Sequence, residues 1–128
     1  MAWYRIFSTM AEENGERAED GNTKIVMHVR LDDDNRIDRR IQTFGYCQEY
    51  DEDNDNYLKY PFILEFDDRN EAGIIDYAGW ELNSQNRLNI YNKVIKENEY
   101  FTRFEDRDEM GLRANNEYIY IIDRVVPI

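Results

Sequence analysis

Four stretches of the chain have the side-chain pattern of a β-strand, in three of them as a period of two along the chain and in the last as apolar residues on both faces. They span residues 3–8, 24–31, 57–66 and 117–126. The clearest is the second, one face of which carries Ile25, Met27, Val29 and Leu31. The last is rich in Tyr and Ile on both faces, which indicates a strand that is covered on each side. Pro61, inside the third, has no amide proton to donate, so we expect it at a sheet edge or a bulge.

Two further regions mix helical and strand spacing. Residues 36–50 place Ile37, Ile41 and Phe44 at helical intervals, but apolar and polar positions alternate from Ile41 onward. We therefore expect a strand after residue 40 and leave 36–40 open. Residues 87–104 contain a helical stripe that is interrupted by asparagines, which are poor helix formers. There we expect two strands with a turn near residues 97–98.

Residue types and turn signals together favour one fold class. Val, Ile, Thr, Tyr, Phe and Trp, which suit a pleated sheet, number 40, whereas Leu, Ala and Met number 16. Polar clusters typical of turns lie at residues 15–22, 32–35, 51–56, 67–70, 83–86 and 106–116. This pattern predicts a mainly β, single-domain chain over residues 1–128. We expect an antiparallel meander that forms a small sandwich or a partly open barrel, with room for one short helix.

The charge balance narrows the range of partners. The chain carries 28 acidic and 16 basic side chains, for a formal net charge of −12. Because phosphates repel such a surface, direct binding to nucleic acid or to anionic membranes is nearly excluded. The apolar runs are too short for a membrane-spanning helix, and no secretory signal is expected. Cys47 is the only cysteine and cannot form an internal disulfide, so we expect a cytoplasmic protein.

Acidic runs are the most distinctive chemical feature, and all of them fall at predicted turns. The runs cover residues 12–20, 32–34, 49–55, 67–68 and 105–109. One interpretation is a set of solvated loops that keep the protein soluble. The other is an anionic surface that docks on a cationic protein, with neighbouring tyrosines supplying contact area. The residues that we assign to such a partner-binding surface are Asp32, Asp33, Asp34, Tyr50, Asp51, Glu52, Asp53, Asp55 and Tyr57.

The densest acidic run is compatible with two more specific geometries. If residues 51–55 are extended, alternate carboxylates stand about 7 Å apart along one edge, a spacing comparable to that of successive phosphates in a nucleic acid. The same carboxylates also match the first ligand positions of an EF-hand calcium loop. Asn56 and Phe62 stand where that loop needs Gly and a bidentate Glu, so we assign no metal site.

Catalytic chemistry finds little support in the sequence. His28 and Cys47 would lack a third member of a catalytic triad, and no glycine-rich loop for binding phosphate is present. With 28 acidic residues, pairs of carboxylates at a hydrolytic separation occur by chance. We therefore assign no catalytic residue and no cofactor, and we expect a protein that is not an enzyme.

Together these features predict a small acidic protein-binding module with a basic protein partner. We expect an inhibitor or immunity protein that blocks a nucleic-acid-handling protein, such as a nuclease toxin or a phage-defence effector, by acting as a nucleic-acid mimic. The alternative is a non-catalytic accessory or structural domain, for instance of viral origin, with an aromatic interface. A carboxylate-based enzyme or a small-ligand binder is a third and weaker alternative.

Overall fold

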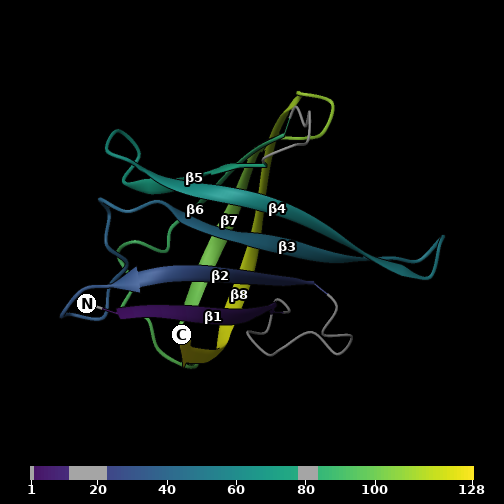
Figure 1. Cartoon of the computed structure of the whole chain (residues 1–128). Helices are drawn as coiled ribbons and strands as arrows, with labels where there is room; N and C mark the ends of the chain where they lie inside the picture. The colour runs from purple at the N-terminus through teal and green to yellow at the C-terminus, as the bar shows by residue number, and fades with distance from the viewer. Residues whose placement is uncertain (1, 12–22, 78–83) are drawn as a thin grey trace.

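The computed structural model describes residues 2–11, 23–77 and 84–128. Within them the chain forms eight antiparallel strands, each paired with the next, and the first strand pairs with the last to close a barrel (Figure 1). The strands are β1 (Ala2–Met10), β2 (Lys24–Leu31), β3 (Thr43–Asp51), β4 (Asn56–Asp67), β5 (Ala72–Asp76), β6 (Gln85–Leu88), β7 (Tyr100–Arg107) and β8 (Arg113–Pro127). The mainly β antiparallel meander is therefore confirmed. It forms a fully closed barrel, rather than a sandwich or an open barrel.

The four stretches with a strand pattern all lie within strands of this barrel. The strand expected after residue 40 is β3, while residues 36–40 form no regular element beyond a single bridge between Ile37 and Leu31. The two strands expected in residues 87–104 are β6 and β7, although β6 already ends at Leu88. The sequence did not single out β5, and the described residues contain no helix. The turn signal at residues 15–22 lies outside the described residues.

The strand register points one face of each strand into the barrel. Ile6 lies opposite Met27 and Ser8 lies opposite Ile25, so residues that face each other across β1 and β2 share the interior. The four apolar residues that share one face of β2 are at most 3% exposed. Removing such side chains from water stabilises the fold by roughly 25 cal/mol per Å² of apolar surface. In β2, the apolar positions of the alternating pattern are thus the ones that line the barrel interior.

The two ends of the barrel differ. One end, which we call the closed end, is covered by the β2–β3 connection (residues 32–42) and the β6–β7 connection (residues 89–99). Four side chains from these connections belong to the same buried cluster as the barrel interior, namely Ile37, Ile90, Tyr91 and Ile95. The opposite end, which we call the mouth, contains the β3–β4 and β7–β8 hairpins.

The β3–β4 hairpin extends well beyond the barrel (Figure 1). In the described residues, β3 is the only pairing partner of the outer part of β4, because β5 pairs with β4 from Ile63 to Asp67 and with no earlier residue of β4. Pro61 lies in this one-sided stretch, opposite Tyr46 of β3. Among the described residues, no strand pairs with β4 on this side at Pro61, in agreement with the expected edge position, where the amide proton that proline lacks is not needed.

Candidate functional site

Six of the nine residues assigned to a partner-binding surface lie on the β3–β4 hairpin. The strands pair up to Asp51 and Asn56, and residues 52–55 form the turn. The carboxylate of Asp51 stabilises this turn, because its Oδ1 accepts a 3.1 Å hydrogen bond from the Asp53 amide and its Oδ2 accepts a 2.7 Å bond from the Asn54 side chain. Asp55 completes the reversal with a φ of 47°, in the left-handed region that Asp tolerates.

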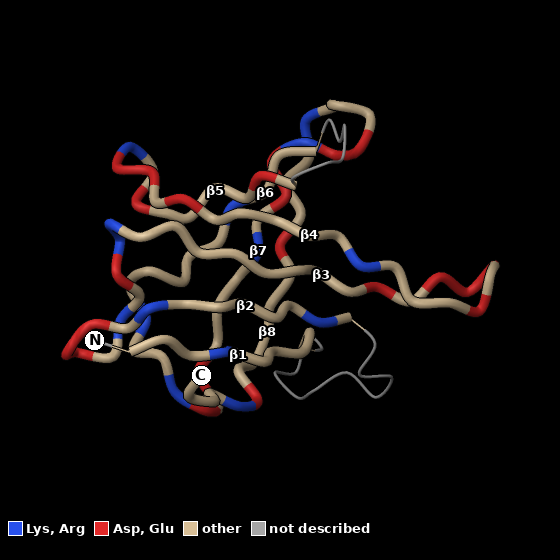
Figure 2. Tube along the Cα trace, in the orientation of Figure 1, with Lys and Arg blue, Asp and Glu red and all other residues tan. Residues whose placement is uncertain are grey.

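This turn excludes the extended row of carboxylates. Asp51, Asp53 and Asp55 lie around a chain reversal, so the even spacing that would imitate successive phosphates is not formed. The acidic residues lie instead at the tip of the hairpin, at the right of Figure 2. The site is therefore a compact acidic tip rather than a linear copy of a nucleic-acid strand.

Aromatic and apolar side chains lie directly behind this tip. The rings of Tyr50 and Tyr57 face each other across the hairpin with centroids 5.4 Å apart. The hydroxyl of Tyr50 donates a hydrogen bond to Oδ1 of Asp55, and this bond raises the pKa of Tyr50. Tyr57 is 49% exposed and its neighbour Leu58 is 37% exposed. The hairpin thus offers apolar contact area next to its charge.

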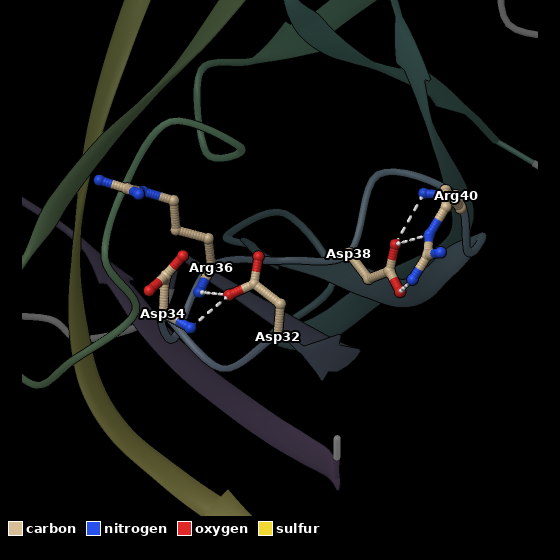
Figure 3. Close-up of polar contacts among 5 residues, drawn as sticks. All are labelled: Asp32, Asp34, Arg36, Asp38 and Arg40. Atoms are coloured by element: carbon tan, nitrogen blue, oxygen red, sulfur yellow. Dashed lines mark hydrogen bonds and ion pairs between the residues drawn. The ribbon is translucent and has the colours of Figure 1, made fainter.

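Asp32, Asp33 and Asp34 lie at the other end of the molecule. They begin the β2–β3 connection at the closed end, while β3 runs from that end to the mouth before it reaches Asp51. Oδ1 of Asp32 accepts hydrogen bonds from the amides of Asp34 at 2.8 Å and Arg36 at 3.0 Å, so this carboxylate stabilises its own turn (Figure 3). Residues 32–34 and 49–57 therefore do not form one contiguous patch, because β3 separates them by its full length.

The closed end also interleaves its acids with cations (Figure 2). The backbone amide, Nε and Nη2 of Arg40 each donate a 3.0 Å hydrogen bond to the carboxylate of Asp38 (Figure 3). These bonds lower the pKa of Asp38 to about 2. Arg39 stacks over the ring of Phe66, with its guanidinium carbon 4.5 Å from the centroid. The mixture of signs makes this end a poorer anionic surface than the hairpin tip.

The mouth contains a buried charge that the sequence analysis missed. Arg103 of β7 points into the barrel and is 8% exposed. Its Nη1 donates a 2.6 Å hydrogen bond to Oδ1 of Asn86, and its Nε lies 3.4 Å from the hydroxyl of Tyr120. Its guanidinium carbon lies 4.3 Å from the ring centroid of Tyr118. Alternation along β7 does not single out this position, since Phe101 and Arg103 share the inner face while Phe104 lies on the other face.

Cys47 and His28 do not form a pair. Cys47 lies opposite Ile25 on the inner face of the barrel, whereas His28 lies opposite Phe44 on the outer face. Burial raises the pKa of the Cys47 thiol to about 11, the Arg103 charge opposes this rise, and Glu49 adds to it. Such a thiol stays protonated at neutral pH and is a poor nucleophile.

Three aromatic side chains, one from each strand, lie together on the outer face of β1, β2 and β3. The rings of His28 and Phe44 stack with their centroids 4.8 Å apart. The ring centroid of Trp3 lies 6.5 Å from that of Phe44. Nε of Arg5 donates a 2.9 Å hydrogen bond to Nε2 of His28. Phe44 is 51% exposed. We call Trp3, His28 and Phe44 the aromatic face.

Neither a metal centre nor a membrane-spanning helix is found in the parts of the chain that the structure describes. No group of three or more His, Cys, Asp or Glu side chains in these ranges is arranged to hold a metal ion. No helix in them has the length and apolar character needed to cross a membrane. Comparisons of the chain with protein-family models, curated proteins and solved structures find no match.

Proposed function

We propose that the protein is a small acidic protein-binding module that inserts the tip of its β3–β4 hairpin into a basic groove of a nucleic-acid-handling protein and blocks it. The observation that carries the proposal is the projection of this hairpin beyond the barrel with acidic residues at its tip (Figure 2). A groove that normally accepts phosphates is basic and concave. Nuclease toxins and phage-defence effectors therefore represent the expected partner class.

The charges of the tip are available to a partner. No Lys or Arg in the described ranges forms an ion pair with Asp51, Glu52, Asp53 or Asp55, since the ion pairs there join Arg40 to Asp38 and Arg87 to Asp106. Unneutralised carboxylates attract a cationic surface over distances of about 8–10 Å at moderate salt. They therefore accelerate association and disfavour acidic partners.

The apolar side chains behind the tip would supply the contact area that charge alone lacks. Tyr57 and Leu58 are both more than one third exposed on a two-stranded arm. Tyrosine is enriched in protein interfaces because its ring buries apolar area while its hydroxyl keeps a hydrogen-bond partner. Charge at the tip would set the orientation of docking, and these side chains would slow dissociation.

The test compares two charge reversals of equal size at opposite ends of the barrel. Glu52→Lys/Asp53→Lys changes the tip without removing the carboxylates of Asp51 and Asp55, which form hydrogen bonds in the hairpin. Asp33→Lys/Asp34→Lys makes the same change at the closed end and serves as the matched control. Wild-type protein and both variants are immobilised and used for capture from extracts of the host and its competitors, with identification by mass spectrometry.

Support for the proposal requires a captured basic nucleic-acid-handling protein with three properties. It binds the wild type and the closed-end control, it is lost with the tip variant, and duplex DNA or RNA displaces it. Binding should also weaken steeply as salt rises from about 50 to 500 mM, because exposed charges are screened. A partner that the tip variant retains at wild-type affinity, or that is itself acidic, would contradict the proposal.

The aromatic face supports a second candidate, a non-catalytic accessory or structural domain. Phe44 is half exposed and stacks on His28, which places apolar ring surface outside the barrel. This candidate predicts that Phe44→Ser abolishes partner binding while the tip variant leaves it unchanged. The docking proposal predicts the reverse pattern.

A further inference from the structure

The mouth of the barrel holds a cavity that hairpin docking does not use. Its volume is about 50 Å³, and its walls include Cys47, Tyr60, Tyr77, Asn86, Arg103 and Tyr120. A water molecule needs about 10–15 Å³ of such volume, so a few waters or one small polar group fit inside. Small eight-stranded barrels commonly use this position to hold a single small ligand.

The guanidinium of Arg103 is the buried charge of this cavity. Both of its side-chain hydrogen bonds go to neutral oxygens, those of Asn86 and Tyr120. No carboxylate in residues 2–11, 23–77 and 84–128 forms an ion pair with it. An arginine keeps its charge when buried, and burial without a counter-charge is costly. A carboxylate in the cavity would supply that counter-charge and could accept two parallel N–H bonds from the guanidinium fork.

The outer wall of the same cavity carries the opposite charge. Glu49 comes from β3, Glu105 from β7 and Glu109 from the β7–β8 hairpin. Glu105 also accepts a 2.8 Å hydrogen bond from Asn116. Arg103 and Glu49 both act on the Cys47 thiol, with opposite effects on its pKa, so the two charges border one space. A simple anion would be repelled at the entrance, whereas a ligand that also carries a positive group would be attracted there.

We infer that the mouth of the barrel binds a small zwitterion, an amino acid or a similar ammonium carboxylate. The carboxylate pairs with Arg103 at the inner end of the cavity, and the ammonium group lies towards Glu49 and Glu105. The rings of Tyr60 and Tyr77 stand edge to face, with centroids 6.4 Å apart, and provide aromatic wall for the short carbon skeleton. The cavity volume limits the enclosed part of the ligand to a few non-hydrogen atoms, and a longer side chain would extend outward.

The test is a titration of the full chain with small-molecule probes. Isothermal calorimetry measures the affinity, and chemical shifts of ¹⁵N-labelled protein locate the binding site. The probes are glycine, alanine and β-alanine, compared with acetate and propanoate, which lack the ammonium group, and with ethylamine, which lacks the carboxylate. We expect the zwitterions to bind at least about tenfold more tightly than either single-charge series, with shifts at β3, β6 and β7.

Three variants assign the two charges. Arg103→Lys keeps the positive charge but loses the guanidinium fork, and we expect at least about a tenfold loss of amino-acid affinity. Glu49→Gln changes an exposed residue and should reduce the preference for alanine over propanoate about threefold or more. This variant tests the site independently of whether Arg103→Lys folds. Glu97→Gln, an exposed change at the closed end, is the matched control and should bind as the wild type does.

Several outcomes would overturn the inference. They are the absence of saturable amino-acid binding below about 10 mM, equal binding of propanoate and alanine, and unchanged affinity in both Arg103→Lys and Glu49→Gln. The result is separable from hairpin docking, because Glu52→Lys/Asp53→Lys alters the tip and should leave amino-acid affinity at the wild-type value.

Discussion

The backbone amide of Ile95 donates a 2.8 Å hydrogen bond to the carbonyl oxygen of Asn35, and this bond joins the two connections that cover the closed end of the barrel. Asn35 adopts a φ of 58°, a left-handed conformation that Asn tolerates better than most residues. Ile95 itself is 5% exposed and packs into the main core. Segments 60 residues apart in the chain thus close one end of the barrel together.

We expect Ile95→Ala to lower the free energy of unfolding by about 2–5 kcal/mol, because it removes a buried side chain and leaves a cavity. The measurement is urea unfolding followed by tryptophan fluorescence. Val94→Ala, at the neighbouring and 36% exposed position, is the control and should cost less than about 1 kcal/mol. Equal losses in the two variants would show that the β6–β7 connection does not cover the core.

Gly45 is required by the close approach of β2. A β-carbon at this position would stand 2.1 Å from the Val26 carbonyl oxygen, a backbone atom that cannot move without disturbing the sheet. At Gly73 the close atoms belong to the side chains of Leu64 and Tyr91 instead, at 2.7–2.8 Å. We expect Gly45→Ala to destabilise the protein by about 3 kcal/mol or more and Gly73→Ala by about 1–3 kcal/mol. Thermal unfolding of both variants in parallel checks this order, and the reverse order would contradict it.

Asp38 should make the stability of the protein sensitive to acid. Its hydrogen bonds with Arg40 lower its pKa from 3.8 to about 2 in the folded chain. The unfolded chain therefore binds more protons in this range, so the stabilising contribution is present above pH 3.8 and is lost as the pH falls towards 2. We expect Asp38→Asn to flatten the pH dependence of the unfolding free energy between pH 4 and 2.

The control for this experiment is Asp33→Asn, in the same connection but with no described residue donating a hydrogen bond to its carboxylate. It should keep the wild-type slope over that interval. A wild-type slope in Asp38→Asn would mean that the Arg40 bonds do not persist in solution.

His28 should titrate below its ordinary value. Burial lowers its pKa from 6.5, and the nearby charge of Arg5 lowers it further. His28 is the only histidine, so a single imidazole signal in NMR reports its titration. We expect a midpoint below pH 6.5 in the wild type and a rise towards that value in Arg5→Gln. A midpoint at or above 6.5 in the wild type would contradict the acceptor role of its Nε2.

The candidate site shows where sequence reasoning reached its limit. The acidic and tyrosine residues of the hairpin could be identified, because charge runs and turn signals are properties of neighbouring residues. Their separation from residues 32–34 was not visible in the sequence, because loops at the two ends of a strand look alike in sequence but lie a strand length apart. Arg103 was missed for a similar reason, since its neighbours Asn86 and Tyr120 reach it only through pairing between strands.

The sequence by itself determined that the chain is an antiparallel β protein. It located β1, β2 and β4 from their alternating side chains and β8 from its Tyr- and Ile-rich faces, because residue types and the side-chain period of a strand are local properties of the chain. Tertiary structure decided that β1 pairs with β8, that Ile37 and Ile95 close one end, and that Arg103 lies inside the other. These features depend on which distant segments pair and in what register. A shift of β7 by one residue against β6 and β8 would turn Arg103 to the outside and leave the periodicity of the sequence unchanged.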